Sequence, residues 1–125
     1  METITVFETK AVHVRAHLTK GDGTSLLRAD VSVSGITAVL YDLRSDTPHT
    51  ALSTTVLTTN DVLFDTAMTA GWRKTGTYNF IYVVPGTFLV QGGGHYRVEI
   101  ELDGVSEDDD NWIVFQVKTV DLLGV

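Results

Sequence analysis

The chain lacks cysteine altogether, has two prolines in 125 residues, and has no apolar run near the ~20 residues needed to cross a bilayer. Without cysteine, disulfides and thiolate-bound zinc or iron–sulfur sites are excluded. The opening residues 1–5 have neither the basic start nor the apolar stretch of a secretion signal, so we expect none. Nine Lys and Arg against 16 Asp and Glu give a net charge of −7, which argues against nucleic acid as a partner because phosphate binding needs a basic face.

Good helix formers are also scarce, with seven Ala, five Glu and four Lys. The β-branched residues Thr (18), Val (17) and Ile (5) make up close to a third of the chain, and these residues suit a pleated surface. No stretch of a dozen residues keeps a 3.6-residue apolar period. The composition therefore predicts an all-β protein with little or no helix.

Alternation of apolar and polar residues predicts about seven short strands. In the clearest, 96–102, Tyr96 and Ile100 share an inward face and Glu99 points outward. Stretch 66–74 breaks the alternation, and we expect a helical turn there. The expected strands are 12–18, 35–43, 53–58, 62–64, 78–84, 96–102 and 112–120. This pattern is typical of an immunoglobulin-like two-sheet β-sandwich, with a small barrel as the alternative.

A single sandwich domain is expected over residues 12–120. Residues 1–11 form an N-terminal arm or an edge strand, and residues 121–125 form a short C-terminal tail. We expect edge strands, the N-terminal arm and the apolar C-terminal tail to be able to pair with neighbouring subunits by strand addition.

The segment Glu99–Asp110 contains seven acids and no base, while the rest of the chain has nine of each. It therefore accounts for the whole net charge. Three readings of the Asp103–Asn111 loop are open: a solvated hairpin tip, a contact with a basic partner, or a calcium site. Its spacing does not match the EF-hand pattern.

Residues able to carry catalysis or bind a metal are scattered. His13 and His17 lie four apart on an expected strand, about 13 Å from each other and too far to share one metal. His49 and His95 are expected in loops, and Glu99 and Glu101 on an outward face. Since no nucleophile elbow, phosphate loop or His-Glu-x-x-His motif is present, we expect no enzyme activity, no catalytic or metal site and no cofactor.

Aromatic residues offer a possible platform for sugar rings. The candidates are Trp72, Tyr78, Tyr82, Tyr96 and Trp112. Tyr82 and Tyr96 share strand faces with apolar residues, and aromatics at strand spacing usually belong to the core. Trp72, in a loop, and Trp112, at a strand end, are the ones free to face solvent.

Several pieces of the chain resemble small immunoglobulin-like proteins encoded among the structural genes of tailed phages and prophages. The resemblance covers residues 11–117 and is most specific at Gly76-Thr77-Tyr78-Asn79-Phe80 and Tyr96-Arg97-Val98-Glu99. It also extends to macroglobulin-type and bacterial surface sandwich modules. The further matching pieces are 23–24, 29–32, Ile36, 40–42, 62–66, Trp72, 84–85 and 94–100.

The resemblance implies a non-enzymatic structural or assembly protein. It would be a component of a phage-type virion at a head, connector or tail position, assembled in the host cytoplasm. Its partners would be other virion proteins and further copies of itself, with no nucleic acid and no membrane. The alternative is a sandwich module that binds carbohydrate or a cell surface, with or without calcium.

Overall fold

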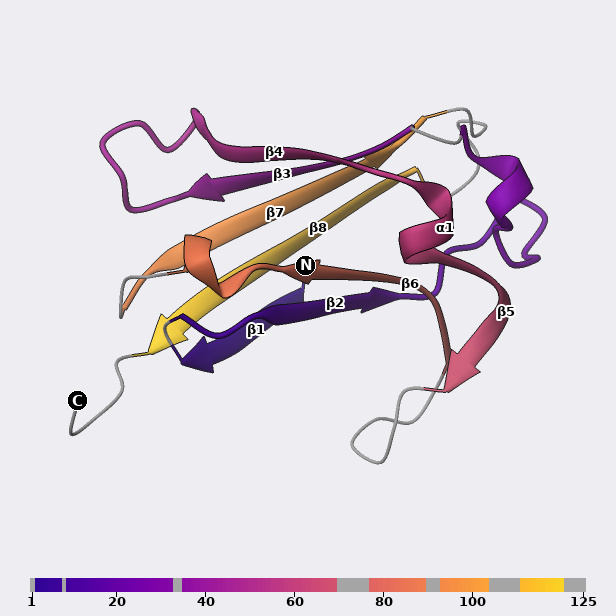
Figure 1. Cartoon of the computed structure of the whole chain (residues 1–125), viewed down its shortest axis with the longest axis horizontal. Helices are drawn as coiled ribbons and strands as arrows, with labels where there is room; N and C mark the ends of the chain where they lie inside the picture. The colour runs from indigo at the N-terminus through magenta and orange to yellow at the C-terminus, as the bar shows by residue number, and fades with distance from the viewer. Residues whose placement is uncertain are drawn as a thin grey trace.

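The chain folds into two layers of β-sheet in the computed structural model, which describes residues 2–7, 9–32, 35–69, 77–89, 93–103 and 111–120 (Figure 1). The elements in chain order are β1 (Glu2–Phe7), β2 (Val12–Ala16), the 3-10 turn η1 (Arg28–Asp30), β3 (Ile36–Asp42), β4 (Ala51–Leu57), α1 (Thr59–Val62), β5 (Leu63–Thr69), β6 (Thr77–Val84), the 3-10 turn η2 (Gly86–Phe88), β7 (His95–Leu102) and β8 (Trp112–Val120).

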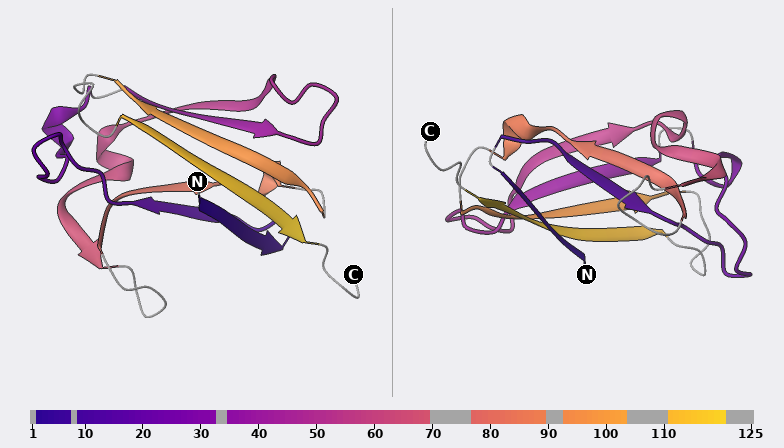
Figure 2. Two further views of the ribbon diagram at one scale, coloured as in Figure 1. Left: turned by 180° about the vertical axis from the view of Figure 1, so that it is seen from behind. Right: turned by 90° about the horizontal axis from the view of Figure 1, so that it is seen from below.

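The larger sheet has the strand order β1-β8-β7-β3-β4 and the smaller one the order β2-β6-β5. All neighbours pair antiparallel except β1, which runs parallel to β8. Figure 2 shows the two sheets packed face to face from two further directions. This division of strands is that of an immunoglobulin-like sandwich, with β8-β7-β3-β4 and β2-β6-β5 in the places of the G-F-C-C′ and B-E-D strands.

The predicted all-β sandwich is therefore confirmed, and the described residues contain eight strands where about seven were expected. The additional strand is β1, whose residues Glu2–Phe7 pair in register with Phe115–Val120. The β8 strand has the bounds expected from its alternation, and β7 begins one residue earlier than expected. His95 thus lies on a strand, and its placement in a loop was wrong.

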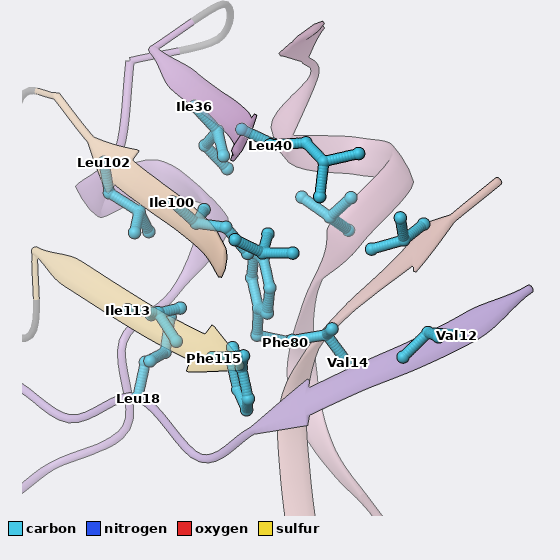
Figure 3. Packing of buried hydrophobic residues seen from close by; sticks show 14 of the residues in the cluster. Val12, Val14, Leu18, Ile36, Leu40, Phe80, Ile100, Leu102, Ile113 and Phe115 are labelled. Carbon is cyan, nitrogen blue, oxygen red and sulfur yellow. The ribbon is translucent and has the colours of Figure 1, made fainter. Parts of the chain in front are cut away.

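Alternate side chains of both sheets fill the space between them (Figure 3). Ile36, Ile100 and Phe115 come from the larger sheet and Val14 and Phe80 from the smaller one, and each is at most 4% exposed. Because side chains on a strand alternate between its two faces, burying these residues fixes which residues the larger sheet turns outward.

A helical turn was expected over 66–74, but residues 66–69 belong to strand β5, and residues 70–74 lie outside the described residues. The turn lies earlier, at α1, where the Thr58 hydroxyl donates to the Asp61 carboxylate at 2.5 Å. The N–H of Asp61 also donates to the carbonyl of Thr58 at 3.1 Å, so the backbone and the side chains of these two residues are joined at the start of the turn. Trp72, which the turn was expected to carry, lies outside the described residues.

The crossing from one sheet to the other between β1 and β2 depends on Gly86. The N–H of Thr9 donates to the carbonyl of Leu89 at 2.7 Å, which brings the backbone of Thr9 against η2. A Cβ atom on Gly86 would lie 2.2 Å from the carbonyl oxygen of Thr9. Only glycine permits this approach, which holds the end of β1 in place.

Asn79 is a buried polar residue of β6, and its side chain forms hydrogen bonds with the backbone of the loop that follows β2. Its Oδ1 accepts from the N–H of Leu18 at 2.7 Å, and its Nδ2 donates to the carbonyls of Leu18 at 2.9 Å and Leu26 at 3.1 Å. Strand β2 ends at Ala16, so these bonds keep the following loop paired to β6 and bring Leu18 and Leu26 into the core.

We predict that Asn79→Ala lowers the free energy of unfolding by about 2–5 kcal/mol, because it leaves buried backbone groups of Leu18 and Leu26 unpaired. Asn60→Ala, at an exposed position of α1, is the matched control and should change it by less than about 0.5 kcal/mol. Urea denaturation followed by tryptophan fluorescence measures both. Equal stability of the two variants would contradict the role given to Asn79.

Candidate functional site

The larger sheet has one face packed on the core and one face turned away from it, which we call the outward face. It is defined by alternation and register of its five strands. Its members are Thr3, Thr5 and Phe7 of β1, Trp112, Val114, Gln116, Lys118 and Val120 of β8, His95, Arg97, Glu99 and Glu101 of β7, Thr37, Val39 and Tyr41 of β3, and Leu52, Thr54 and Val56 of β4.

Exposed apolar side chains gather on the outward face. In the described part of the chain, eight large hydrophobic side chains are exposed, and five of these belong to the outward face. The five are Phe7, Leu52, Val56, Trp112 and Val120. Val56 and Trp112 are exposed by 63% and 53%. Such a concentration on one face marks a candidate contact surface.

Charge is separated along the strands of the outward face. Going along β7, the basic side chains His95 and Arg97 come first and the acidic Glu99 and Glu101 follow. On β8, Lys118 pairs with His95 and Trp112 pairs with Glu101. The outward face therefore has a basic end and an acidic end.

An ion pair lies where the two ends meet. The Nε atom of Arg97 is 3.4 Å from the Oε2 atom of Glu99. That Nε atom is buried and has no hydrogen-bond partner among the described residues, although the side chain as a whole is 37% exposed. Because that Nε atom is buried, a carboxylate from outside could pair only with the exposed part of the Arg97 side chain.

Two shallow hollows open on or beside the outward face. One of about 210 Å³ is lined by Tyr41, Pro48, His49 and the Arg97–Glu99 pair. The other, of about 320 Å³, lies at the basic end and includes Arg44, His95 and Lys118. One hollow lies near the centre of the outward face and the other at its basic end, and both have polar side chains in their lining.

The edges of the two sheets are β1 and β4 in the larger and β2 and β5 in the smaller. Along β4 and its two flanking threonines, residues 50–58 include neither a charge nor a proline, the residues that commonly protect an edge. A shift of register between Leu40 and Tyr41 leaves Leu52 as the extra residue of a bulge, which interrupts the edge near one end.

The other histidines considered from the sequence are dispersed. His13 is exposed on β2, and His17 follows that strand, with its ring nitrogens bonded to Thr77 at 3.0 Å and Ser25 at 3.2 Å. His49 lines the smaller hollow. Across the described ranges, no three His, Asp or Glu side chains lie together as metal ligands.

The aromatic residues divide between the core and the surface. Tyr96 is 1% exposed and Tyr82 packs partly buried against the core. Tyr78 contacts the ring of Phe64, with centroids 6.2 Å apart, and lies under the guanidinium of Arg15. Trp112 remains as the exposed tryptophan of the described chain, beside Glu101.

Most of the Asp103–Asn111 loop lies outside the described residues, so its calcium reading stays a prediction. Its two ends are described, and the N–H of Leu102 donates to the carbonyl of Asn111 at 2.9 Å, which closes the β7–β8 hairpin. None of the helices in the described ranges has the length and hydrophobicity to pass through a membrane.

Comparisons with protein-family models, curated proteins and solved structures gave no match. Function is therefore inferred from the residues of the chain. The outward face was not apparent from individual residues in the sequence. Its residues come from strands that lie more than a hundred positions apart in the chain. Its signal in the sequence is the alternation of 95–101 and 112–120, once the strand order is known.

We predict that the apolar residues of the outward face contribute little to folding. Val56→Thr should change the free energy of unfolding by less than about 0.5 kcal/mol. The isosteric control Val98→Thr, at an inward position 1% exposed, should cost about 1–3 kcal/mol because it buries a hydroxyl. Thermal and urea denaturation measure both, and a similar loss in the two variants would contradict the division between faces.

Proposed function

We propose that this chain is a non-enzymatic assembly protein, a component of a phage-type particle that acts through contacts with other proteins. The observation that carries the proposal is the outward face, which gathers five of the eight exposed large hydrophobic side chains in the described chain. Protein contact surfaces combine exposed aromatic residues and arginine with a polar surround, as Trp112 and Arg97 do here. The resemblance of the motifs at 76–80 and 96–99 supports the assignment to a particle.

The mode of action follows from the rigidity of the fold. The central strands β3, β7 and β8 bury their opposite face in the core, so the middle of the outward face is presented without rearrangement. Preformed surfaces lose little conformational entropy on binding. Such a face suits repeated, geometrically fixed contacts between subunits, which a particle requires.

The proposal predicts that the chain is found in purified particles at a fixed ratio to the major structural protein. Particles released from the source cells would be purified on a density gradient and quantified by mass spectrometry. A constant ratio that survives a high-salt wash is the expected result. Absence of the chain from the particle fraction would contradict the proposal.

The carbohydrate-binding alternative has one supporting observation, the exposure of Trp112. Titration with a panel of glycans, with and without calcium, would be followed by the fluorescence of the tryptophans. Saturable quenching that disappears in Trp112→Ala would favour the binding module over the assembly protein. The assembly protein predicts no saturable change.

A further inference from the structure

We propose that the outward face packs against the outward face of a second copy of this chain, with the strands of the two copies antiparallel. The inference rests on the proposed function and names the partner of the surface. It follows from the charge distribution on β7 and β8 and from the symmetry that two identical copies require.

The basic and acidic side chains of the outward face are ordered along the strand direction. His95 and Arg97 precede Glu99 and Glu101 on β7, at successive outward positions. Lys118 is paired with His95, so it strengthens the basic end. No acidic side chain of the described residues interrupts the basic end on β7 or β8.

Two copies joined face to face by a two-fold axis have a limited choice of arrangements. If the axis runs along the strands, each level of one sheet meets the same level of the other, so acidic residues face acidic residues. If the axis lies in the interface and perpendicular to the strands, the levels are exchanged. With the axis at the level of Val98, Glu99 faces Arg97 of the second copy and Glu101 faces the level of His95 and Lys118.

The second arrangement is therefore the one that the charges favour, because opposite charges then face each other across the interface. It also brings a carboxylate of the second copy toward the Arg97 side chain, which is 37% exposed. Sheets packed face to face keep their strands within about 30° of each other, so the exchange of levels persists despite the twist.

The uncharged positions agree with this arrangement. Val39 of β3 lies level with Glu99 and Tyr41 lies level with Arg97, so exchange brings the valine of one copy toward the tyrosine of the other. Trp112, level with Glu101, comes to the level of Lys118 in the second copy. A lysine over an indole ring is a favourable cation–π contact.

Charge reversal at the centre of the face tests the proposal by sedimentation equilibrium over a hundredfold range of concentration. The wild-type chain is expected to form a dimer. Arg97→Glu and Glu99→Arg should each weaken dimerisation by about a hundredfold or more, because each places like charges together. Raising the salt to about 1 M should weaken the wild-type dimer.

Recombining the variants separates this contact from a general effect of charge. A mixture of the Arg97→Glu and Glu99→Arg proteins should form a dimer containing one copy of each, because an acidic centre then faces a basic one. The double variant, which exchanges the two charges, should dimerise with itself. Lys10→Glu, a matched change of charge at an exposed position off the outward face, should leave the dimer unaffected. Circular dichroism checks that each variant is folded.

A strictly monomeric wild-type chain, or a dimer unaffected by Arg97→Glu, would overturn the inference. Either result together with the chain's presence in particles would leave the proposed function standing with a different partner on the face. If the chain forms a charge-dependent dimer but is absent from particles, the inferred contact between two copies would be supported and the proposed function in particles would be contradicted.

Discussion

Alternation of side chains along β3, β7 and β8 is the constraint on which the rest of this structure depends. Tyr96, Val98 and Ile100 are at most 1% exposed, and each intervening residue of β7 is consequently turned outward. A slip of one residue in register would bury Arg97 and Glu99 and expose the core residues. The same burial that stabilises the sandwich therefore fixes the composition of the outward face.

Because burial of the inward side chains fixes the positions of the outward ones, the outward face can act as a contact surface. Its positions are held by strands whose other side is committed to the core, while its own apolar side chains remain accessible. Phe7 belongs to β1, which is tied to β8 on one side and whose end is positioned by the approach of Thr9 to Gly86. The outward face thus extends across all five hydrogen-bonded strands of the larger sheet.

Much of the fold could be predicted from the sequence because alternation is a local signal. The faces of 96–102 and 112–120 follow directly from it, and Tyr96 and Ile100 lie in the core as expected. The start of α1 was missed, although Thr58 and Asp61 carry a helix-initiating spacing. Asn79 was missed in its structural role because its partners, Leu18 and Leu26, lie more than fifty residues away.

The candidate site was harder to predict, because its residues can be recognised as neighbours only when the strand order is known. Val56, Thr37, Glu101 and Trp112 form one row across four strands, and no local pattern relates them. The parallel pairing of β1 with β8 joins the two ends of the chain. Alternation identifies 112–120 as a strand, but it does not show which strand lies beside it.

The most direct test of the outward face as a contact surface uses the absence of cysteine from the chain. Two single-cysteine variants would be labelled with a maleimide over a hundredfold range of protein concentration. Thr54→Cys places the thiol on the outward face, and His13→Cys places it at an exposed position of the smaller sheet. The rate per molecule should fall with concentration at position 54 and stay constant at position 13. Equal, concentration-independent labelling at both positions would contradict the account.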